Sequence, residues 1–189
     1  MTLILNEAEV RRLLPMGDLV SAMERVLEQF STGQGIVQPL RSVLSVGAEQ
    51  AYYGVMPASL TDPPALGVKL VTNYSSNQAR NLPSHLATIV LLDPETGALT
   101  AILDGRYITE ARTAAVSAVA ARHLARRNGE PSKLAIIGSG AQARSHLTAF
   151  TETLSIDMVY IWSPSTAHRE QFASQMTLRT KQAVQAVAD

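Results

Sequence analysis

One turn of the sequence has the residue types and spacing of a dinucleotide-binding loop. Residues 138–143 read GSGAQA, the pattern G-x-G-x-x-A, between an apolar run at 134–137 and a helix-like stretch at 141–154. Strand, turn and helix in succession are the context that such a site requires. The glycines permit the tight turn and a close approach of backbone to pyrophosphate, and free N–H groups at the helix start attract its charge. We predict a dinucleotide site here; the alternative is an ordinary tight turn.

The residues after the predicted strand at 158–162 indicate which dinucleotide is bound. A site for NAD usually has an acidic residue at the end of the second strand. Here residues 163–166 read SPST and contain no carboxylate. Small hydroxyl side chains leave room for a 2′-phosphate, and Arg144, His168 or Arg169 could supply positive charge. This favours NADP, with NAD possible; these residues could also simply cap the following helix.

Two basic residues could hold an acidic substrate. Lys69 is a lone charge in the apolar strand at 67–71, where burial is costly unless the charge is paired or functional. The alternative is a solvent-facing lysine on an edge strand. Arg112 opens an alanine-rich helical segment, and its planar fork could bind two oxygens of a carboxylate or phosphate. The alternative is a surface arginine.

Three further polar residues lie where a strand begins or a loop ends. Arg41 stands at the start of a predicted strand and is ambiguous by itself. Ser84 and His85 follow a proline and are candidate loop contacts.

The N-terminal part of the chain must position these basic residues. Asn6 and Glu9 form a capping box for a short helix, and apolar residues of 16–30 recur at helical spacing, which predicts a core-facing stripe. Strands are expected at 41–46, 52–56, 66–72, 86–92 and 98–103, followed by an alanine-rich helix at 108–127. The pattern predicts an α+β domain with a mostly antiparallel sheet, over residues 1–130.

The C-terminal part alternates strand and helix. Apolar strands are expected at 134–137, 158–162 and 183–187, the first of the fully buried kind, with helices between them. This order predicts a parallel, doubly wound α/β domain over residues 131–189.

Composition excludes several classes of protein. The 189 residues contain 16 Lys+Arg, 16 Asp+Glu and no cysteine. Disulfide scaffolds, zinc ribbons and thiol nucleophiles are therefore excluded, and four scattered histidines predict no metal site. Zero net charge gives no reason to expect nucleic acid or a membrane as partner. With no basic leader or long apolar run, we expect a cytoplasmic protein.

Taken together, the segments resemble the ornithine cyclodeaminase/mu-crystallin family, most closely its ketimine reductase branch. The resemblance is carried by residues 67–71, 82–88, 104–105, 108–109, 112–118, 138–143 and 161–162. It implies an N-terminal α+β domain that binds substrate and forms a homodimer, a Rossmann-type domain, and an active site in the cleft between them. The implied activity is NAD(P)H-dependent reduction of a cyclic imino acid, a ketimine carboxylate.

The resemblance also implies roles for particular residues. Lys69 would act at the reacting centre, and Arg41, Lys69 and Arg112 would hold the carboxylate of a small imino or amino acid. Together with the glycine turn, it assigns cofactor contacts to Ser84, His85, Arg112, Thr113, Gly138, Gly140, Ala141, Gln142, Ala143, Arg144, Ser163, Ser165 and His168.

The sequence departs from the family pattern in three places. Only 57 residues follow Ser132, whereas a full dinucleotide domain takes about 120 to 150, so the Rossmann domain looks truncated and the family's later catalytic aspartate has no match. We expect impaired catalysis and an exposed apolar sheet edge. Met56 replaces the acidic residue of ornithine cyclodeaminases, and Pro164 replaces the arginine that contacts the NADP phosphate in mu-crystallin. The alternatives are a deaminating cyclisation of ornithine and a non-catalytic protein that binds NADPH and a small acid.

Overall fold

The computed structural model describes residues 1–47, 51–125 and 129–188, and these form two compact units. The first unit comprises Met1–Leu14 and Arg25–Thr109, and the second comprises Pro15–Glu24 and Glu110–Asp189. The sequence-based division at residues 130 and 131 follows chain order. The compact units follow contacts between residues, and the second of them also includes residues 15–24, 110–125 and 129–130.

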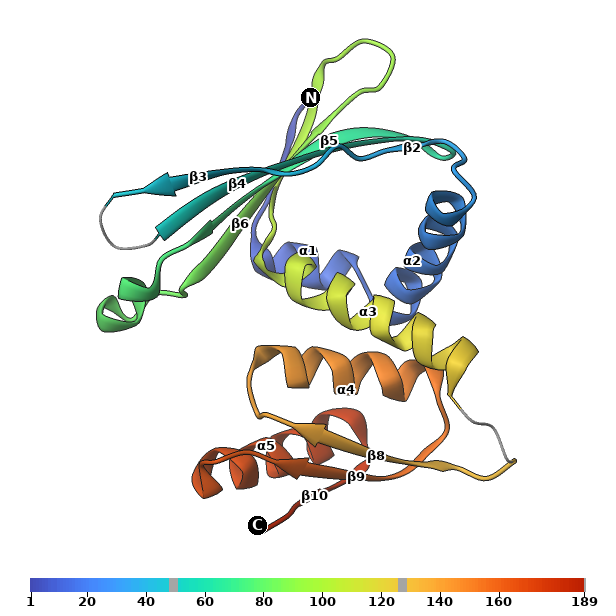
Figure 1. The fold of residues 1–189 in the computed structure, drawn as a ribbon, viewed down its shortest axis with the longest axis vertical. Helices are drawn as coiled ribbons and strands as arrows, with labels where there is room; N and C mark the ends of the chain where they lie inside the picture. Colours follow the sequence, from blue (N-terminus) through green and yellow to red (C-terminus); the bar gives the residue numbers. More distant parts are fainter. Residues whose placement is uncertain (48–50, 126–128, 189) are drawn as a thin grey trace. The chain divides into compact units, whose positions relative to one another are not determined.

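The first unit is built on a seven-stranded sheet of order β1-β7-β6-β5-β4-β2, with β3 also paired to β4 (Figure 1). Its strands are β1 (Leu3–Leu5), β2 (Ile36–Val37), β3 (Ser42–Val46), β4 (Ala51–Thr61), β5 (Pro64–Asn73), β6 (His85–Leu92) and β7 (Leu99–Asp104). Every pairing is antiparallel except β1 with β7. The predicted strands and the mostly antiparallel sheet are confirmed.

Side-chain hydrogen bonds begin a helix at Asn6 and hold the turn at Asp93. Asn6 caps helix α1 (Glu7–Leu13): its Oδ1 accepts from Glu9 N at 3.0 Å, and Glu9 Oε2 accepts from Asn6 N at 2.9 Å. The predicted capping box is thereby confirmed. Between β6 and β7, Asp93 Oδ1 accepts from the Thr96 hydroxyl and from two backbone N–H groups, and these hydrogen bonds lower the pKa of Asp93.

The long helices contribute residues to both units. Helix α2 (Met16–Ser31) buries Met16, Leu19 and Val20 within the second unit. Phe30 lies in the part of α2 that belongs to the first unit and is 57% exposed, so the predicted stripe is buried over its N-terminal half only. Helix α3 (Arg106–Leu124) buries four alanines completely, Ala111, Ala114, Ala115 and Ala118.

An ion-pair cluster joins α2 to α3 inside the second unit. The Glu24 carboxylate lies 2.6 Å from His123 Nε2 and 2.5 Å from Arg122 Nη1. The hydrogen bond with His123 and the charge of Arg122 hold the pKa of Glu24 below its ordinary value.

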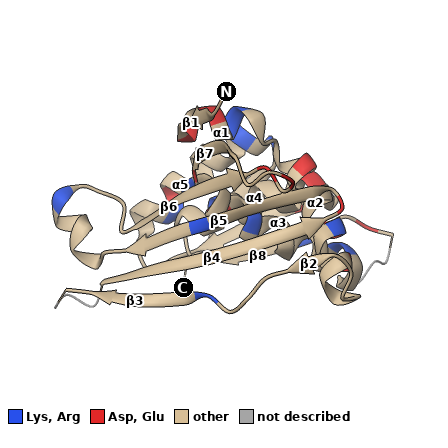
Figure 2. Ribbon diagram, turned by 90° about the horizontal axis from the view of Figure 1, so that it is seen from above, with Lys and Arg blue, Asp and Glu red and all other residues tan. Residues whose placement is uncertain are grey.

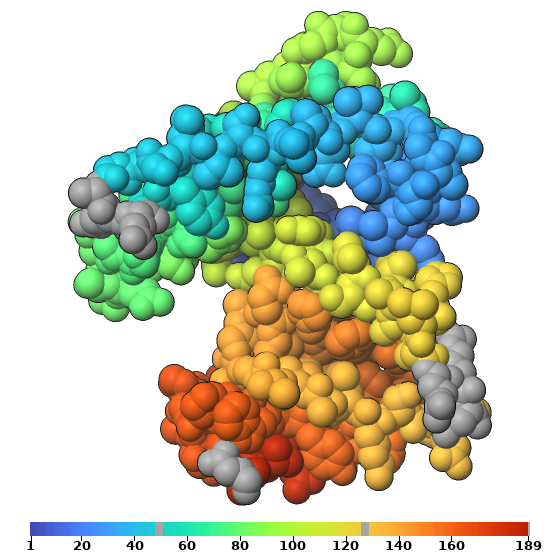
Figure 3. Space-filling view, viewed as in Figure 1, coloured from blue at the N-terminus to red at the C-terminus, as the bar shows by residue number. Residues whose placement is uncertain are grey.

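A three-stranded parallel sheet of order β10-β9-β8 completes the second unit. Its strands are β8 (Ser132–Ile137), β9 (Ile156–Trp162) and β10 (Ala183–Ala186), linked by helices α4 (Ala141–Thr153) and α5 (Thr166–Thr180). In the space-filling view these elements form a closely packed, orange to red body (Figure 3). The core comprises Leu147, Ile156, Val159, Ile161, Phe172, Ala173 and Met176. The predicted parallel strand–helix alternation is confirmed.

The prediction that the first of these strands is fully buried is wrong. Leu134 and Ile136 pack against the core, whereas Ala135 is exposed and Ile137 is 84% exposed. Both connecting helices supply core residues to the face that carries Leu134 and Ile136, so the alternate residues of β8 have no helix over them in the described part of this unit. Within that part, β8 is also an edge strand.

Candidate dinucleotide and acid-binding site

The glycine turn opens directly onto free space. Gly138 has φ +107°, a conformation that L side chains rarely adopt, and its N–H donates to Trp162 O at 2.7 Å. A Cβ built at Gly138 or at Gly140 would meet no heavy atom within 4 Å. The turn is therefore shaped by backbone conformation, and its outer side is accessible to a ligand.

Helix α4 begins at this turn with its N–H groups uncapped by any side chain. Gly140 is the N-cap residue and forms no side-chain cap, and the first turn contains no acidic residue. A hollow of about 410 Å³ lies beside it, lined by Leu134, Ala135, Ile136, Ile137, Gly138, Gly140, Gln142, Ala143, His146 and Phe150. Uncapped N–H groups and the positive end of the helix dipole suit a diphosphate. The residues present therefore fit the dinucleotide that the sequence predicts.

The loop after β9 is held by a chain of hydroxyl groups. Ser139 Oγ donates to Ser163 Oγ at 3.1 Å, and Ser163 Oγ donates to Ser165 O at 3.2 Å. Arg169 is buried, and its Nη1 donates to Ser163 O at 2.9 Å. Ser163 and Arg169 therefore shape this loop from inside, so a role for Ser163 in cofactor binding would be exerted through the loop shape.

The start of α5 bears the outward-facing residues of the predicted adenosine end. Ser165 Oγ accepts from His168 N at 3.3 Å, so the interpretation of this segment as a helix cap is confirmed. Ser165 is half-buried and His168 is exposed. The guanidinium of Arg144 lies 5.6 Å from the centroid of the Phe172 ring, so Arg144 packs against α5.

Lys69 lies on an interior strand, because β5 is flanked by β4 and β6. The edge-strand alternative is therefore wrong. Figure 2 shows strands β4 to β6 almost free of charged residues, and Lys69 is their only Lys, Arg, Asp or Glu. Lys69 is half-buried and shares its sheet face with Val71, which is 7% exposed, because side chains two residues apart point to the same side. A charge at this position stands in an apolar surface.

The strand register places other candidates close to Lys69. Met56 is paired directly with Lys69 across β4 and β5, and Ile89 is its partner on β6. Arg41 is exposed and immediately precedes Ser42, whose partner on β4 is Val55, the neighbour of Met56. Arg41 and Lys69 thus lie at about one level of the sheet of the first unit, on either side of β4, with Met56 between them.

A short 3-10 helix, η1 (Ser75–Arg80), shapes the loop before β6. Buried Asn77 donates from Nδ2 to Pro83 O at 2.9 Å, and Ser84 O accepts from Tyr74 N at 2.8 Å. Ser84 and His85 are half-buried, and His85 is paired with Asn73 at the start of β6.

Arg112 and Thr113 lie on α3 in the second unit. Helix α3 begins at Arg106, so Arg112 sits in its second turn, not near its start as the sequence suggested. Arg112 is exposed, and Thr113 O lies 3.3 Å from Ser117 Oγ on the next turn of α3. The predicted site residues are thus distributed over both units, with Arg41, Lys69, Ser84 and His85 in the first and the remainder in the second.

Sequence reasoning missed two residues near the glycine turn. Ser139 occupies a variable position of the G-x-G pattern, and only the structure shows that its hydroxyl reaches Ser163. His146 lines the hollow and bonds to Ser117 on α3. A histidine four residues after Gln142 lies on the same helix face, and that spacing was the signal available.

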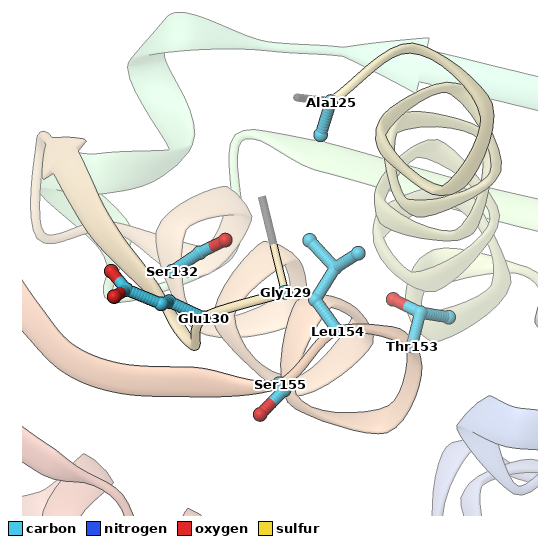
Figure 4. A pocket seen from close by; sticks show the side chains of 7 residues that line it. All are labelled: Ala125, Gly129, Glu130, Ser132, Thr153, Leu154 and Ser155. Carbon is cyan, nitrogen blue, oxygen red and sulfur yellow. The ribbon is translucent and has the colours of Figure 1, made fainter. Parts of the chain in front are cut away.

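A second hollow lies at the other end of β8. Figure 4 shows the described residues that line it, and among these Glu130 alone is charged. It shares no lining residue with the hollow at the glycine turn. Over residues 1–47, 51–125 and 129–188, no group of His, Asp and Glu is placed to hold a metal ion. No helix within those ranges is long and apolar enough to cross a membrane.

A parallel sheet with an open glycine turn before an uncapped helix defines a Rossmann-type dinucleotide fold, present here in part. The family model of the ornithine cyclodeaminase/mu-crystallin family matches residues 1–189, and the chain belongs to that family. The ketimine reductase mu-crystallin of Rattus norvegicus is 41% identical over 160 residues, covering 84% of this chain and 50% of that protein.

Solved structures support the same assignment. The Δ1-pyrroline-2-carboxylate reductase of Thermococcus litoralis, in complex with NADH and L-proline, matches with a TM-score of 0.91 and 33% identity over 100% of this chain and 57% of that one. The iminosuccinate reductase of Paracoccus denitrificans, in complex with NAD+, has a TM-score of 0.88 and 26% identity over 99% and 57% of the two chains. This chain therefore spans about half the length of the relatives it matches.

Proposed function

We propose that this protein binds NAD(P)H and reduces the C=N bond of a small imino acid carboxylate. The observation that carries the proposal is the open turn at Gly138 and Gly140, which leads into a helix whose N-terminus is uncapped. Family membership and the two reductase structures support the reaction type. A reduced nicotinamide supplies the hydride, which adds to the imine carbon while a proton is taken up at nitrogen.

The basic residues of the chain have distinct tasks in this proposal. Lys69, in an apolar sheet face, orients the substrate carboxylate or relays the proton to nitrogen. Arg41 and Arg112 hold the carboxylate through their guanidinium forks, which can donate two parallel hydrogen bonds. Fixing the acid in this way can lower the barrier by several kcal/mol through orientation.

The residues of the second unit hold the cofactor. N–H groups of Ala141, Gln142 and Ala143 face the diphosphate, and Arg144, Ser165 and His168 lie toward the adenosine end. Arg112, Thr113, Ser84 and His85 contact the remaining cofactor. We favour NADP because residues 163–166, directly after β9, contain no carboxylate. The two solved relatives are complexes with NADH and NAD+, so the test compares both dinucleotides.

The test combines dinucleotide titration with turnover. Trp162 is the chain's one tryptophan, and its carbonyl bonds to the glycine turn, so quenching of its fluorescence by NADH or NADPH reports binding. Turnover is followed as NAD(P)H oxidation with Δ1-pyrroline-2-carboxylate. We expect saturable quenching, and NAD(P)H oxidation that depends on the added imine. Quenching that fails to saturate with either dinucleotide would falsify the proposal.

A non-catalytic binding function is the second candidate, favoured because the open glycine turn and the uncapped start of α4 account for dinucleotide binding by themselves. Saturable dinucleotide binding without any imine turnover would support it. A deaminating cyclisation of ornithine is disfavoured by Met56, whose thioether offers no charge to a substrate amine. That reaction needs no external reductant, so ornithine consumption without added NAD(P)H would support it instead.

We further propose that the first unit forms a homodimer. Strand β3 exposes Val43 and Leu44, which point to opposite faces of the sheet, by 52% and 59%. Among the described residues β3 pairs with β4 alone, so its other edge is open to a strand of a second copy. Sedimentation velocity of the protein and of Leu44→Lys tests the proposal: the wild type should sediment as a dimer and the variant as a monomer.

A further inference from the structure

A histidine on α4 forms a polar contact with α3. His146 Nδ1 lies 2.7 Å from Gln142 O, and Nε2 lies 3.0 Å from Ser117 Oγ. A carbonyl oxygen can only accept, so in the neutral ring Nδ1 carries the proton and Nε2 accepts from the Ser117 hydroxyl. Both ring nitrogens are therefore engaged, and the orientation of the ring is determined.

The contact joins two helical turns that contain predicted site residues. Gln142 is in the first turn of α4, directly after the N-cap Gly140. Ser117 Oγ also lies 3.3 Å from Thr113 O, in the turn of α3 that carries Arg112. The Ser117 proton given to His146 Nε2 is not available to Thr113 O, so the link runs from Gln142 through His146 to Ser117 by hydrogen bonds and from Ser117 to the turn of Arg112 by the backbone of α3, all within the second unit.

The surrounding surface of α3 gives this polar contact its importance. The wholly buried residues of α3 are the alanines at 111, 114, 115 and 118, while Tyr107 and Val119 are buried to more than nine-tenths. Helices that pack through large side chains are held in register by ridges that enter grooves. Alanines form shallow ridges, so they limit sliding and rotation of α3 less than large side chains would, and a directional hydrogen bond such as that of Ser117 with His146 adds a restraint.

We propose that Ser117 and His146 are a positioning pair that sets Arg112 relative to the dinucleotide turn, and so couples binding of the cofactor to binding of the acid. The inference rests on the proposed function, since it needs both ligands. Neither residue touches the reacting atoms in this scheme. His146 acts through the Gln142 carbonyl and Ser117 acts through the turn of Arg112. Bound dinucleotide then favours the arrangement in which Arg112 receives the carboxylate, and the reverse holds by linkage.

Matched variants distinguish loss of the Ser117–His146 hydrogen bond from a general disturbance of α3 and α4. Ser117→Ala removes the hydroxyl, and His146→Asn is too short to reach Ser117. His146→Gln places an amide oxygen near the position of Nε2, and Ser117→Thr keeps a hydroxyl, so both should rescue. Thr151→Ala is the control, because it removes a hydrogen bond from Thr151 Oγ1 to Thr148 O within α4 only.

The measurement is the Kd of NADH and of NADPH from Trp162 quenching, with and without saturating L-proline as the carboxylate probe. We expect proline to tighten dinucleotide binding about fivefold or more in the wild type, within the usual range of coupling between sites. The ratio should fall to about one in Ser117→Ala and His146→Asn, and stay near the wild-type value in His146→Gln, Ser117→Thr and Thr151→Ala.

Several outcomes decide the inference. Full coupling in both Ser117→Ala and His146→Asn overturns it, and so does independent binding of proline and dinucleotide in the wild type. Absence of dinucleotide binding in the wild type overturns the proposed function and, with it, this inference. Circular dichroism verifies folding of each variant. If Ser117→Ala does not fold, the comparison of His146→Asn with His146→Gln decides alone, since both keep a polar side chain.

Discussion

Met56 lies directly opposite Lys69 in the antiparallel ladder of β4 and β5. Opposite residues in such a ladder project to the same face with their Cβ atoms about 4.5–5.5 Å apart. The one cation of these central strands thus has a thioether as its cross-strand neighbour on β4. In ornithine cyclodeaminases, which the chain resembles, the matching position is acidic. Met56 therefore places no negative charge beside Lys69 at this position of the register.

Introducing an acidic residue at this position should weaken acid binding. In Met56→Glu the new carboxylate would compete with the substrate for Lys69, and we expect affinity for L-proline to fall about tenfold, which corresponds to about 1.4 kcal/mol. Met56→Gln is the neutral control and should change it little. Isothermal titration in the presence of NADH measures the difference. Equal losses in both variants would show that shape, not charge, matters here.

Removing the charge of Lys69 should abolish turnover without affecting the cofactor. Lys69→Met keeps an apolar stem of similar length within the sheet, so folding should be retained. We expect imine reduction to fall about 100-fold or more, the usual range for a lost proton-transfer group. The Kd for dinucleotide, read from Trp162 quenching, should be unchanged. Turnover that persists in the variant contradicts the role assigned to Lys69.

Gly138→Ala should destabilise the protein and weaken dinucleotide binding together. The residue has φ +107°, so a side chain strains the backbone by about 1 kcal/mol or more although the space is open. Gly97→Ala is the matched control, because Gly97 also has positive φ and open surroundings but lies in the β6–β7 turn. Both variants should lose stability in urea denaturation, and only Gly138→Ala should raise the Kd for NADPH.

Glu7 should contribute stability that disappears in acid. Burial alone would raise its pKa, but hydrogen bonds and charges from Arg11 and Arg106 outweigh burial and hold the pKa below its ordinary value of 4.5. A lowered folded-state pKa means that the contribution is fully present above pH 4.5 and is lost as the pH falls through the folded value.

The Glu7→Gln variant tests this pH dependence. At pH 7 we expect it to be less stable than the wild type by about 1 kcal/mol, as is usual for partly exposed ion pairs. At pH 3 the two proteins should approach one another, because the wild-type carboxyl begins to bind a proton. Urea denaturation at both pH values gives the difference. A gap that stays constant with pH would exclude the charge of Glu7 as its source.

The exposed end of β8 should promote association. Ile137 is 84% exposed, on a strand that forms the sheet edge among the described residues. Ile137→Lys places a charge on this edge, as natural edge strands do, and should lower concentration-dependent light scattering several-fold. Leu178→Lys is the control, since Leu178 is 82% exposed but lies on α5. An equal reduction in both variants would point to general solubility, not to the edge.

Local patterns in the sequence were sufficient to predict most of the elements and the cofactor turn. The Asn6 cap, the period-two strands and the G-x-G-x-x-A turn each depend on neighbours within a few residues, and interactions of that range can be read from sequence. Strands bounded by Gly, Pro or Asn were therefore placed correctly. Resemblance to the family supplied the roles of Lys69, Arg41 and Arg112, which spacing alone left open.

Tertiary structure alone decided which residues meet. The interior place of Lys69, its pairing with Met56, the bond from Ser139 to Ser163 and the contact of Ser117 with His146 all join residues from different elements. The exposure of Ile137 likewise depends on which face the two helices cover. Such contacts follow from sheet order, register and helix packing, which are set by the free energy of the whole folded chain. They produce no periodic pattern in the sequence around the residues concerned.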